Sequence, residues 1–236
     1  MVSKRKWLRF DLHMHTIKSD GKNSLKEMLK MAKRKGLDAI AITDHNVSSK
    51  FNSEKISEKY GIYVIPGCEL SFLSGHLLVL GLDSELVEKK LKQHKIKERT
   101  CSVIARKKTI RGILQYFIDN GALIIAAHPK IPTGMMSLRG NFLAELYERG
   151  LVHGAEIHND DIEKKFKRKF YRVWHNLAKK FVLKLEIPAY SNSDAHVKNR
   201  LGNRFNMVKL DDPKKLLETL KNGKIEIRHG TKSDLK

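Results

Sequence analysis

Two histidines separated by one residue, His13 and His15, are the first side chains in the sequence that could bind a metal ion. Residues two apart on an extended strand point to the same face, so both imidazoles would lie side by side. The preceding residues 7–10 include the aromatic or apolar Trp7, Leu8 and Phe10, as is typical of a strand. Imidazole nitrogen is a preferred ligand of zinc and iron. Because such a pair also arises by chance, its interpretation depends on the rest of the chain.

Further His, Asp and Glu side chains follow short apolar segments of the chain. The apolar segments are residues 37–43, 62–67, 122–127 and 187–191. The candidate ligands are His13, His15, Asp20, His45, Glu69, His76, His128, Asp194 and His196. In a closed parallel barrel the carboxyl ends of the strands converge on one face, where active sites lie. We therefore expect these residues to meet in one metal site, with Asp44 orienting His45 from behind.

The intervening segments have the periodicity of helices, which predicts repeated βα units. Ser24 to Glu27 indicates a capping box that opens a helix, and Gly36 is expected to end it. Residues 83–118 are expected to be mostly helical, with a break near Gly112. The basic segment 161–180 is expected to be another helix. Its residues Phe166, Phe170, Val173 and Leu177 recur at helical spacing, which favours packing in the core over contact with nucleic acid.

Length and composition favour a single α/β domain of barrel size, residues 1–236. The apolar runs are too short to cross a bilayer, and no signal-peptide pattern is present. The two cysteines, Cys68 and Cys101, indicate no disulfide framework and suggest a reducing, cytoplasmic location. With 47 Lys+Arg against 26 Asp+Glu, the net charge is +21. This charge either attracts a polyanion such as nucleic acid or is simply a lysine-rich surface, and no obligate protein partner is indicated.

Taken together, the chemistry-bearing blocks resemble the signature motifs of the PHP (polymerase and histidinol phosphatase) superfamily. In chain order the blocks are His13-Met14-His15-Thr16, Ser19-Asp20-Gly21, Ile42-Thr43-Asp44-His45, Pro66-Gly67-Cys68-Glu69-Leu70-Ser71, His76-Leu77-Leu78, Ala127-His128-Pro129 and Ser193-Asp194-Ala195-His196. The resemblance implies a distorted (β/α)7 TIM-like barrel whose metal centre hydrolyses phosphate esters. It is greatest to the stand-alone phosphoesterases, which include nucleoside bisphosphate phosphatases and oligoribonucleotide exonucleases.

Carried over position by position, the resemblance implies two or three divalent ions of zinc, manganese or iron. The first would be held by His13, His15, Glu69 and Asp194. The second would be held by Asp20, His45 and His196, and the third by His76 and His128. Glu69 would bridge two ions, since the oxygens of one carboxylate can span ions about 3.5–4 Å apart. Asp20 stands where some members have His, which favours Mn²⁺ or Fe²⁺ over Zn²⁺ there.

The resemblance further implies hydrolysis by a metal-bridged hydroxide that attacks phosphorus in line. Glu69 would organise the ions, and His128 or His196 would protonate the leaving oxygen. Relatives often carry Arg two residues after the Pro of Ala127-His128-Pro129, where this chain has Ile131. The cations that we expect to bind the substrate phosphate instead are Lys130, Arg139, Arg200 and Arg204.

Three functions are compatible with these observations. The positive charge favours a hydrolase of nucleotides or short oligonucleotides. A phosphatase for a small phosphomonoester, such as histidinol phosphate, would use the same metals without a polyanion surface. A non-catalytic RNA-binding barrel, like the PHP-related subunit of archaeal ribonuclease P, is the third, although such a protein would be expected to have lost the ligands. Salt dependence separates the first two functions, because polyanion binding weakens steeply with salt.

Overall fold

The computed structural model of the chain describes residues 7–100, 103–129, 138–165, 168–223 and 225–235. The strands in these ranges are β1 (Trp7–Asp11), β2 (Ala39–Ile42), β3 (Tyr63–Phe72), β4 (Gly75–Leu80), β5 (Leu123–Ala126), β6 (Gly154–Asn159), β7 (Ala189–Asn192), β8 (Arg204–Lys209) and β9 (Arg228–Thr231). The α-helices are α1 (Leu25–Arg34), α2 (Ser53–Tyr60), α3 (Ser84–Gln93), α4 (Lys107–Asp119), α5 (Gly140–Glu148), α6 (Asp160–Lys165), α7 (Arg168–Lys184) and α8 (Leu216–Lys221).

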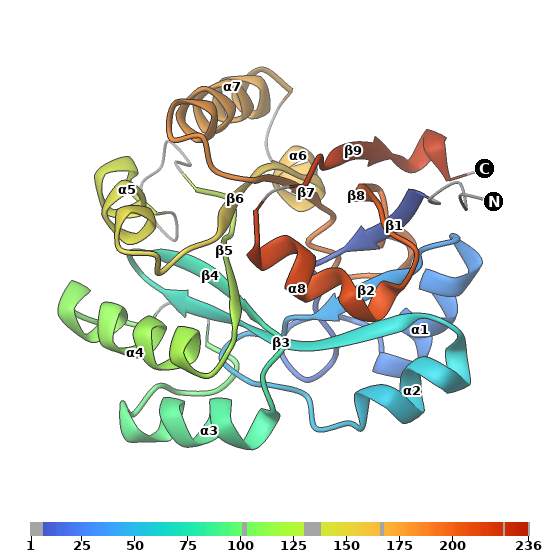
Figure 1. Ribbon diagram of the computed structural model, residues 1–236, viewed down its shortest axis with the longest axis horizontal. Coiled ribbons are helices and arrows are strands. Elements are labelled where there is room, and N and C mark those ends of the chain that lie inside the picture. Colours follow the sequence, from blue (N-terminus) through green and yellow to red (C-terminus); the bar gives the residue numbers. More distant parts are fainter. Residues whose placement is uncertain (1–6, 101–102, 130–137, 166–167, 224, 236) are drawn as a thin grey trace.

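The strands form one curved sheet in the order β7-β6-β5-β4-β3-β2-β1-β8-β9, with helices around its outer face (Figure 1). Parallel pairing joins β1 to β2, β2 to β3, β5 to β6 and β6 to β7. β4 is antiparallel to both its neighbours, β8 is antiparallel to β1, and β9 is antiparallel to β8. The expected α/β barrel is therefore confirmed, but it has nine described strands rather than seven parallel ones.

Side chains, rather than a strand ladder, connect the two ends of the sheet into a nearly closed barrel. The amide of Asn206 on β8 accepts from the backbone N–H of Ser191 on β7 at 2.7 Å and donates to the Ser191 carbonyl at 2.9 Å. This carboxamide thus replaces the peptide group of a neighbouring strand. Asn192 continues the connection by accepting from the N–H of Leu12 at 3.1 Å. The seam places the residues after β1 and β7 side by side.

Alternating residues of the strands face either the barrel interior or the surrounding helices. On β5, Leu123 and Ile125 belong to the interior cluster, whereas Ile124 and Ala126 pack in the outer cluster with buried residues of α4 and α5. The interior cluster also contains Leu216 and Leu220 of α8, which covers one end of the barrel in the foreground of Figure 1. Polar chemistry is thereby restricted to the opposite end.

Several local predictions are confirmed or corrected by these elements. Ser24 and Glu27 form the expected capping box of α1, and Gly36 follows the helix with φ +68°. The break in the segment 83–118 lies between the end of α3 and the start of α4, not at Gly112, which is inside α4. Within this break Val103 pairs with β3, where its N–H donates to the Ser71 carbonyl at 2.9 Å.

The buried face of α7 differs from the predicted stripe. Val173 and Leu177 are 48% and 42% exposed, whereas Tyr171 and Trp174 are buried. Trp174 contributes a larger apolar surface than Val173, and its indole N–H donates to the Pro129 carbonyl at 2.8 Å. Phe170 packs partly against this cluster, and the side chain of Phe166 lies outside the described residues. Within the described residues, no helix is both long and apolar enough to cross a membrane.

Candidate metal centre

All nine sequence-predicted ligands meet at the end of the barrel opposite α8. His13 and His15 follow β1, His45 follows β2, Glu69 lies on β3 and His76 near the start of β4. His128 follows β5, and Asp194 and His196 follow β7. Asp20, in the loop after β1, is the most exposed, with a side chain 44% accessible. The prediction that these distant residues converge is confirmed by their contacts, whereas their role as metal ligands stays a prediction.

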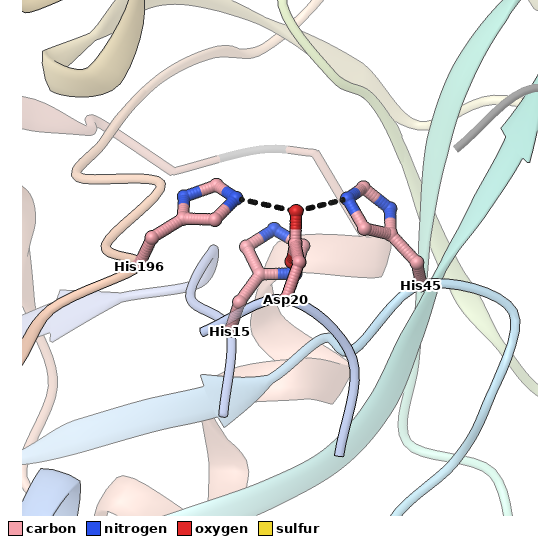
Figure 2. A group of neighbouring side chains, drawn as sticks. All are labelled: His15, Asp20, His45 and His196. Atoms are coloured by element: carbon pink, nitrogen blue, oxygen red, sulfur yellow. Dashed lines mark ion pairs between the residues drawn. The ribbon is translucent and has the colours of Figure 1, made fainter. Parts of the chain in front are cut away.

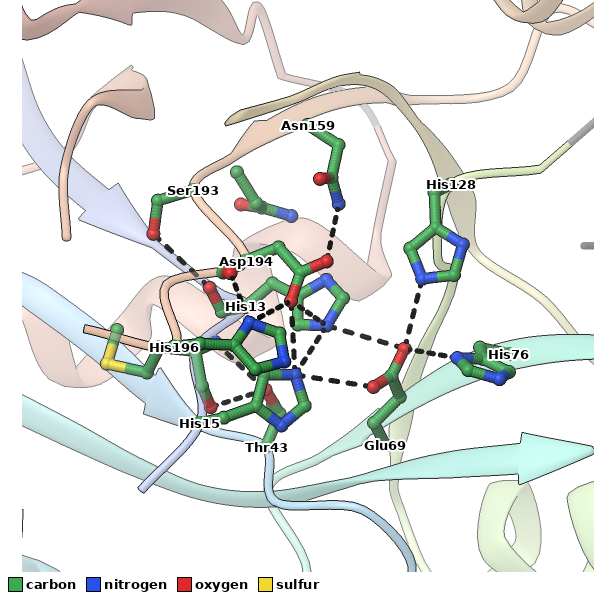
Figure 3. Close-up of polar contacts among 12 residues, drawn as sticks. His13, His15, Thr43, Glu69, His76, His128, Asn159, Ser193, Asp194 and His196 are labelled. Carbon is green, nitrogen blue, oxygen red and sulfur yellow. Dashed lines mark hydrogen bonds and ion pairs between the residues drawn. The ribbon is translucent and has the colours of Figure 1, made fainter. Parts of the chain in front are cut away.

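The first group of ligand atoms surrounds the imidazoles of His13 and His15. Their Nε2 atoms lie 3.3 Å apart. Asp194 Oδ1 lies 3.3 Å from His13 Nε2 and 3.1 Å from His15 Nε2, and Glu69 oxygens lie 3.4 Å from each (Figure 3). Four donors from three segments of the chain thus point at one small volume. This set matches the one implied for the first ion.

The second group surrounds Asp20. Its Oδ2 lies 3.2 Å from His196 Nε2 and 3.5 Å from His45 Nε2, and Figure 2 shows the two imidazoles on either side of the carboxylate. His15 Nδ1 lies 3.6 Å from Asp20 Oδ1. Ligand atoms of all four side chains fall within 4.8 Å of one another. The geometry therefore brings His15, assigned above to the first ion, against the second group as well.

Glu69 lies where the groups join. Its Oε1 is 2.9 Å from His76 Nδ1 and 3.3 Å from His128 Nε2, and its Oε2 is 2.9 Å from His45 Nδ1. Together with His13 and His15, five imidazoles approach the two oxygens of this one carboxylate. The side chain is almost completely buried. A carboxylate in this position has the geometry needed to bridge cations.

The carboxylates of this buried cluster are stabilised in their charged form by the positive charge around them. The imidazoles around Glu69 and Asp194 outweigh the effect of burial and hold the pKa of both carboxyl groups well below the usual range. Burial acts to lower the pKa of His13, but Asp194, Glu156 and Glu69 raise it well above its ordinary value. The raised pKa favours the protonated form of His13 when no metal is bound. Because a metal ligand must be deprotonated, a bound ion would replace such a proton.

Unused acceptor atoms show that the residues fit divalent ions. Glu69 Oε2 and Asp194 Oδ1 are buried, and neither accepts a hydrogen bond of good geometry from the described residues, despite the nearby imidazoles. Leaving a buried carboxylate oxygen without a donor is costly unless a cation faces it. Mixed imidazole and carboxylate donors suit zinc, manganese or iron. The donor set and its unused oxygens thus suit divalent metal ions, whereas the identity and number of the ions stay predictions.

A carboxylate that sequence reasoning missed, Glu156 on β6, supports the first group. Its Oε1 accepts from His13 Nδ1 and Asn192 Nδ2, both at 2.9 Å. Its Oε2 accepts from the His128 N–H at 2.8 Å and from Asn159 Nδ2 at 3.0 Å. A carboxylate on the far nitrogen of a ligating histidine fixes its tautomer and orientation. The available sequence signal was a single Glu within the apolar run 154–157.

The turn that presents Asp20 is fixed by Asp44. Its carboxylate accepts from the Thr16 N–H and hydroxyl and from the Ser19 hydroxyl, each at 2.7 Å. Asp44 was expected to orient His45, but these hydrogen bonds assign it to the turn after β1. Gly21 completes this turn, because an added Cβ would lie 2.5 Å from the His15 carbonyl oxygen.

The cations predicted to bind the substrate phosphate differ in exposure and in whether they form ion pairs with carboxylates. Arg139 is exposed at the N-terminal end of α5. Arg200 and Arg204 form ion pairs with Asp160 at 2.5 Å and Glu163 at 2.7 Å, so each would have to exchange a carboxylate for a phosphate. Lys130 lies outside the described residues. Phosphate binding by these four residues stays a prediction.

Comparison with known proteins finds a solved structure with the same fold over most of the chain and a sequence relative over about half of it. A solved structure from Bacteroides vulgatus, described as a two-domain protein containing a predicted PHP-like metal-dependent phosphoesterase, superposes with a TM-score of 0.67 and 21% identity. The match covers 96% of this chain and 66% of that one, and it shows the shared fold. An uncharacterized protein of Methanocaldococcus jannaschii is 27% identical over 137 residues, which cover 53% of this chain and 70% of the relative.

An enzyme relative matches a shorter part of the chain. The phosphoribosyl 1,2-cyclic phosphate 1,2-diphosphodiesterase of Eggerthella lenta is 31% identical over 80 residues, which cover 31% of this chain and 30% of that enzyme. The model of the PHP domain matches residues 11–128, and that of a PHP-associated region matches residues 173–225. These two regions contain all nine candidate ligands. With half of its residues matched by the first model alone, the chain belongs to the PHP domain family.

Proposed function

We propose that the protein is a metal-dependent phosphoesterase that hydrolyses esters of nucleotides or short oligonucleotides. The observation that carries the proposal is the Glu69 carboxylate, buried at the junction of the ligand groups with five imidazoles around it. The hydrolase class follows from membership of the PHP family. Family membership does not identify the substrate, so the assignment of a nucleotide rests on separate observations.

The residues that would hold the ions follow the geometric groups. His13, His15, Glu69 and Asp194 would hold one ion, and Asp20, His45 and His196 would hold a second beside His15. His76 and His128, on Glu69 Oε1, would hold a third. When bound, divalent ions lower the pKa of water and neutralise charge on a phosphate ester.

The protein side chains would position and protonate the substrate. His196 has 22% of its side chain exposed, against 8% for His128, so it is the better placed to meet a leaving oxygen at the mouth of the barrel. Asp20 Oδ2, 3.2 Å from its Nε2, orients the ring. Glu156 keeps the Nδ1 proton of His13 directed away from the centre, so that Nε2 faces it. In the general-acid role His196 would leave the second ion to His15, Asp20 and His45, and Glu156 would be a positioning residue.

Two observations support a nucleotide substrate. The net charge of +21 creates a field that favours polyanions over neutral molecules and small monoanions. The Eggerthella relative is named for a cyclic phosphate of a phosphoribosyl compound, which shares the ribose phosphate unit of nucleotides. Both observations favour a ribose-linked phosphate ester.

Hydrolysis after metal reconstitution tests this function. Chelated protein is reloaded separately with Mn²⁺, Zn²⁺ or Fe²⁺ and assayed on p-nitrophenyl phosphate, histidinol phosphate, a mononucleotide and a short oligoribonucleotide. We expect hydrolysis of the oligoribonucleotide with a kcat/KM that falls steeply between 50 and about 200 mM salt. No hydrolysis with any ion would refute the phosphoesterase. A preference for histidinol phosphate that is insensitive to salt would refute only the nucleotide substrate.

A further inference from the structure

A cavity of about 800 Å³ lies at the tip of the β3–β4 hairpin, and none of its lining residues is a candidate metal ligand. It is enclosed by the tip of the β3–β4 hairpin, residues 104–105 and the N-terminal ends of α4 and α5, which flank the hairpin in Figure 1. Its main lining residues are Leu73, Ser74, Ile104, Lys107, Arg139 and Phe142. Ligand pockets for small molecules have about this volume.

The hairpin connects this cavity to the candidate ligands. Leu73 lies four residues beyond Glu69 on the same hairpin, a distance of roughly 13 Å at 3.3 Å per residue. Ser74 precedes the ligand His76 by two residues. Gly75 is packed so closely against Leu138 that an added Cβ would lie 2.4 Å from the Leu138 nitrogen, which anchors the hairpin tip to the start of α5. The cavity therefore lies at the ligand end of the barrel.

The apolar part of the lining is unusually accessible. Ile104 is 86% exposed and Leu73 is 39% exposed, although most other large aliphatic side chains of the described residues are buried. Phe142 adds an aromatic ring, with Lys107 Nζ 4.8 Å from its centroid. Grouped exposed apolar side chains on a folded protein commonly mark a binding site. These residues offer a surface for a flat or aliphatic group.

The polar part of the lining suits an anion. The helices α1, α2 and α3 each have a side-chain cap and an acidic residue in the first turn. In contrast, α4 and α5 begin with Arg106 and Arg139 at the N-cap, without a side-chain cap or an acidic residue. Among the described residues no side chain caps these two helix starts, where the first backbone N–H groups and the positive end of the helix dipole favour an anion. The hydroxyl of Ser74 is buried and finds no partner among the described residues.

We propose that this cavity binds the part of the substrate that lies away from the scissile phosphate. A base-like ring would pack against Leu73, Ile104 and Phe142, and a second phosphate would meet Arg139, Lys107 and the N-terminal end of α5. The inference rests on the proposed function and narrows it, because a small monoester cannot span roughly 13 Å from Glu69 to the hairpin tip. The protein would therefore prefer an ester that carries a second anionic group and a ring.

Binding to metal-free protein tests the cavity independently of catalysis. The probe is a fluorescent, 5′-phosphorylated triribonucleotide titrated with chelated wild type, Arg139→Gln and Ile104→Ser. Arg149→Gln is the matched control, since Arg149 is an exposed arginine at the other end of α5. We expect about tenfold weaker binding for Arg139→Gln, the loss of one charge-assisted hydrogen bond. We expect a smaller loss for Ile104→Ser and none for the control.

Kinetics on the reloaded enzyme provide a second readout. Ile104→Ser is expected to raise KM for the triribonucleotide and to leave kcat/KM for p-nitrophenyl phosphate unchanged. Equal binding of the probe by wild type and both cavity variants would refute the inference, even if the enzyme hydrolyses phosphate esters. Conversely, absence of hydrolysis by wild type refutes the proposed function, while weakened probe binding by the variants would still support an anion site in the cavity.

Discussion

Replacement of Glu156 by Gln is expected to weaken both metal binding and stability without removing any candidate ligand. The carboxylate accepts four hydrogen bonds, from His13, Asn192, His128 and Asn159. Glutamine offers one acceptor oxygen, so its NH₂ group would face two of these donors. Two lost bonds to a charged group, at about 1.5–3 kcal/mol each, predict a loss of roughly 3 kcal/mol in the unfolding free energy of the metal-free protein.

The effect on metal binding follows from the tautomer of His13. If the glutamine NH₂ faces Nδ1, the imidazole proton moves to Nε2, the atom that faces Asp194 and Glu69. Loss of such a supporting carboxylate typically lowers metal affinity 10- to 100-fold. Urea unfolding with chelator and a competitive metal titration measure the two effects. Glu145→Gln, on an accessible ion pair with Arg111, is the control and should cost less than about 1 kcal/mol. Wild-type affinity and stability in Glu156→Gln would refute the reasoning.

Three further changes test other parts of the structure. Gly21→Ala should displace the turn that carries Asp20, because the added Cβ would clash with the His15 carbonyl. Metal titration of this variant should then show one bound ion fewer than wild type, and an unchanged number of ions would contradict the prediction. Asn206→Ala should lower the unfolding free energy by about 2–4 kcal/mol, because it leaves two buried backbone groups of Ser191 unpaired. An unfolding free energy from urea titration within about 0.5 kcal/mol of wild type would show that Asn206 does not close the barrel between β7 and β8. Burial, together with the nearby charges of His175 and Arg204, lowers the pKa of His158 to about 3. As the pH falls from 6.5 toward 3, the unfolded chain therefore protonates His158 while the folded chain does not. The unfolding free energy should fall by about 1.4 kcal/mol per pH unit in this range. His158→Gln should remove this slope from unfolding curves of chelated protein, and a slope equal to that of wild type would show that His158 is not its source.

The nine candidate ligands could be predicted because most of them follow a short apolar segment, a position that can be read directly from the sequence. The barrel then converts equivalent strand ends into spatial neighbours. Glu156 could not be found in this way, since it lies within β6, where a polar residue usually faces solvent on an exposed strand. Its inward direction is set by the seam at Asn192 and by the ligand His13. Asn206 was missed for the same reason, because its role exists only when β7 and β8 meet.

The errors in the helices have a different origin. Lys95 and Arg99, between α3 and α4, have left-handed backbones with φ +54° and +60°, yet neither is a residue that predicts such a turn. Their conformation is imposed by tertiary contacts, including the Arg99 N–H to the His45 carbonyl at 2.9 Å. In α7 the predicted helical spacing was correct, but the buried face was assigned to the wrong residues. The helix has two apolar faces, and the face with Tyr171 and Trp174 is the buried one. A single domain over residues 1–236 and a cytoplasmic location stay predictions.

The metal content of the wild type and of the double variant His13→Ala/His15→Ala tests the central claim most directly. Each protein is chelated, reloaded with Mn²⁺, dialysed and analysed for metal, with circular dichroism to check the fold and p-nitrophenyl phosphate to measure activity. We predict two or three ions per wild-type chain, fewer in the double variant, and loss of hydrolysis from a barrel that remains folded. Equal metal content in the two proteins, or activity that survives the double change, would show that the catalytic ions are not held where His13 and His15 meet Glu69 and Asp194.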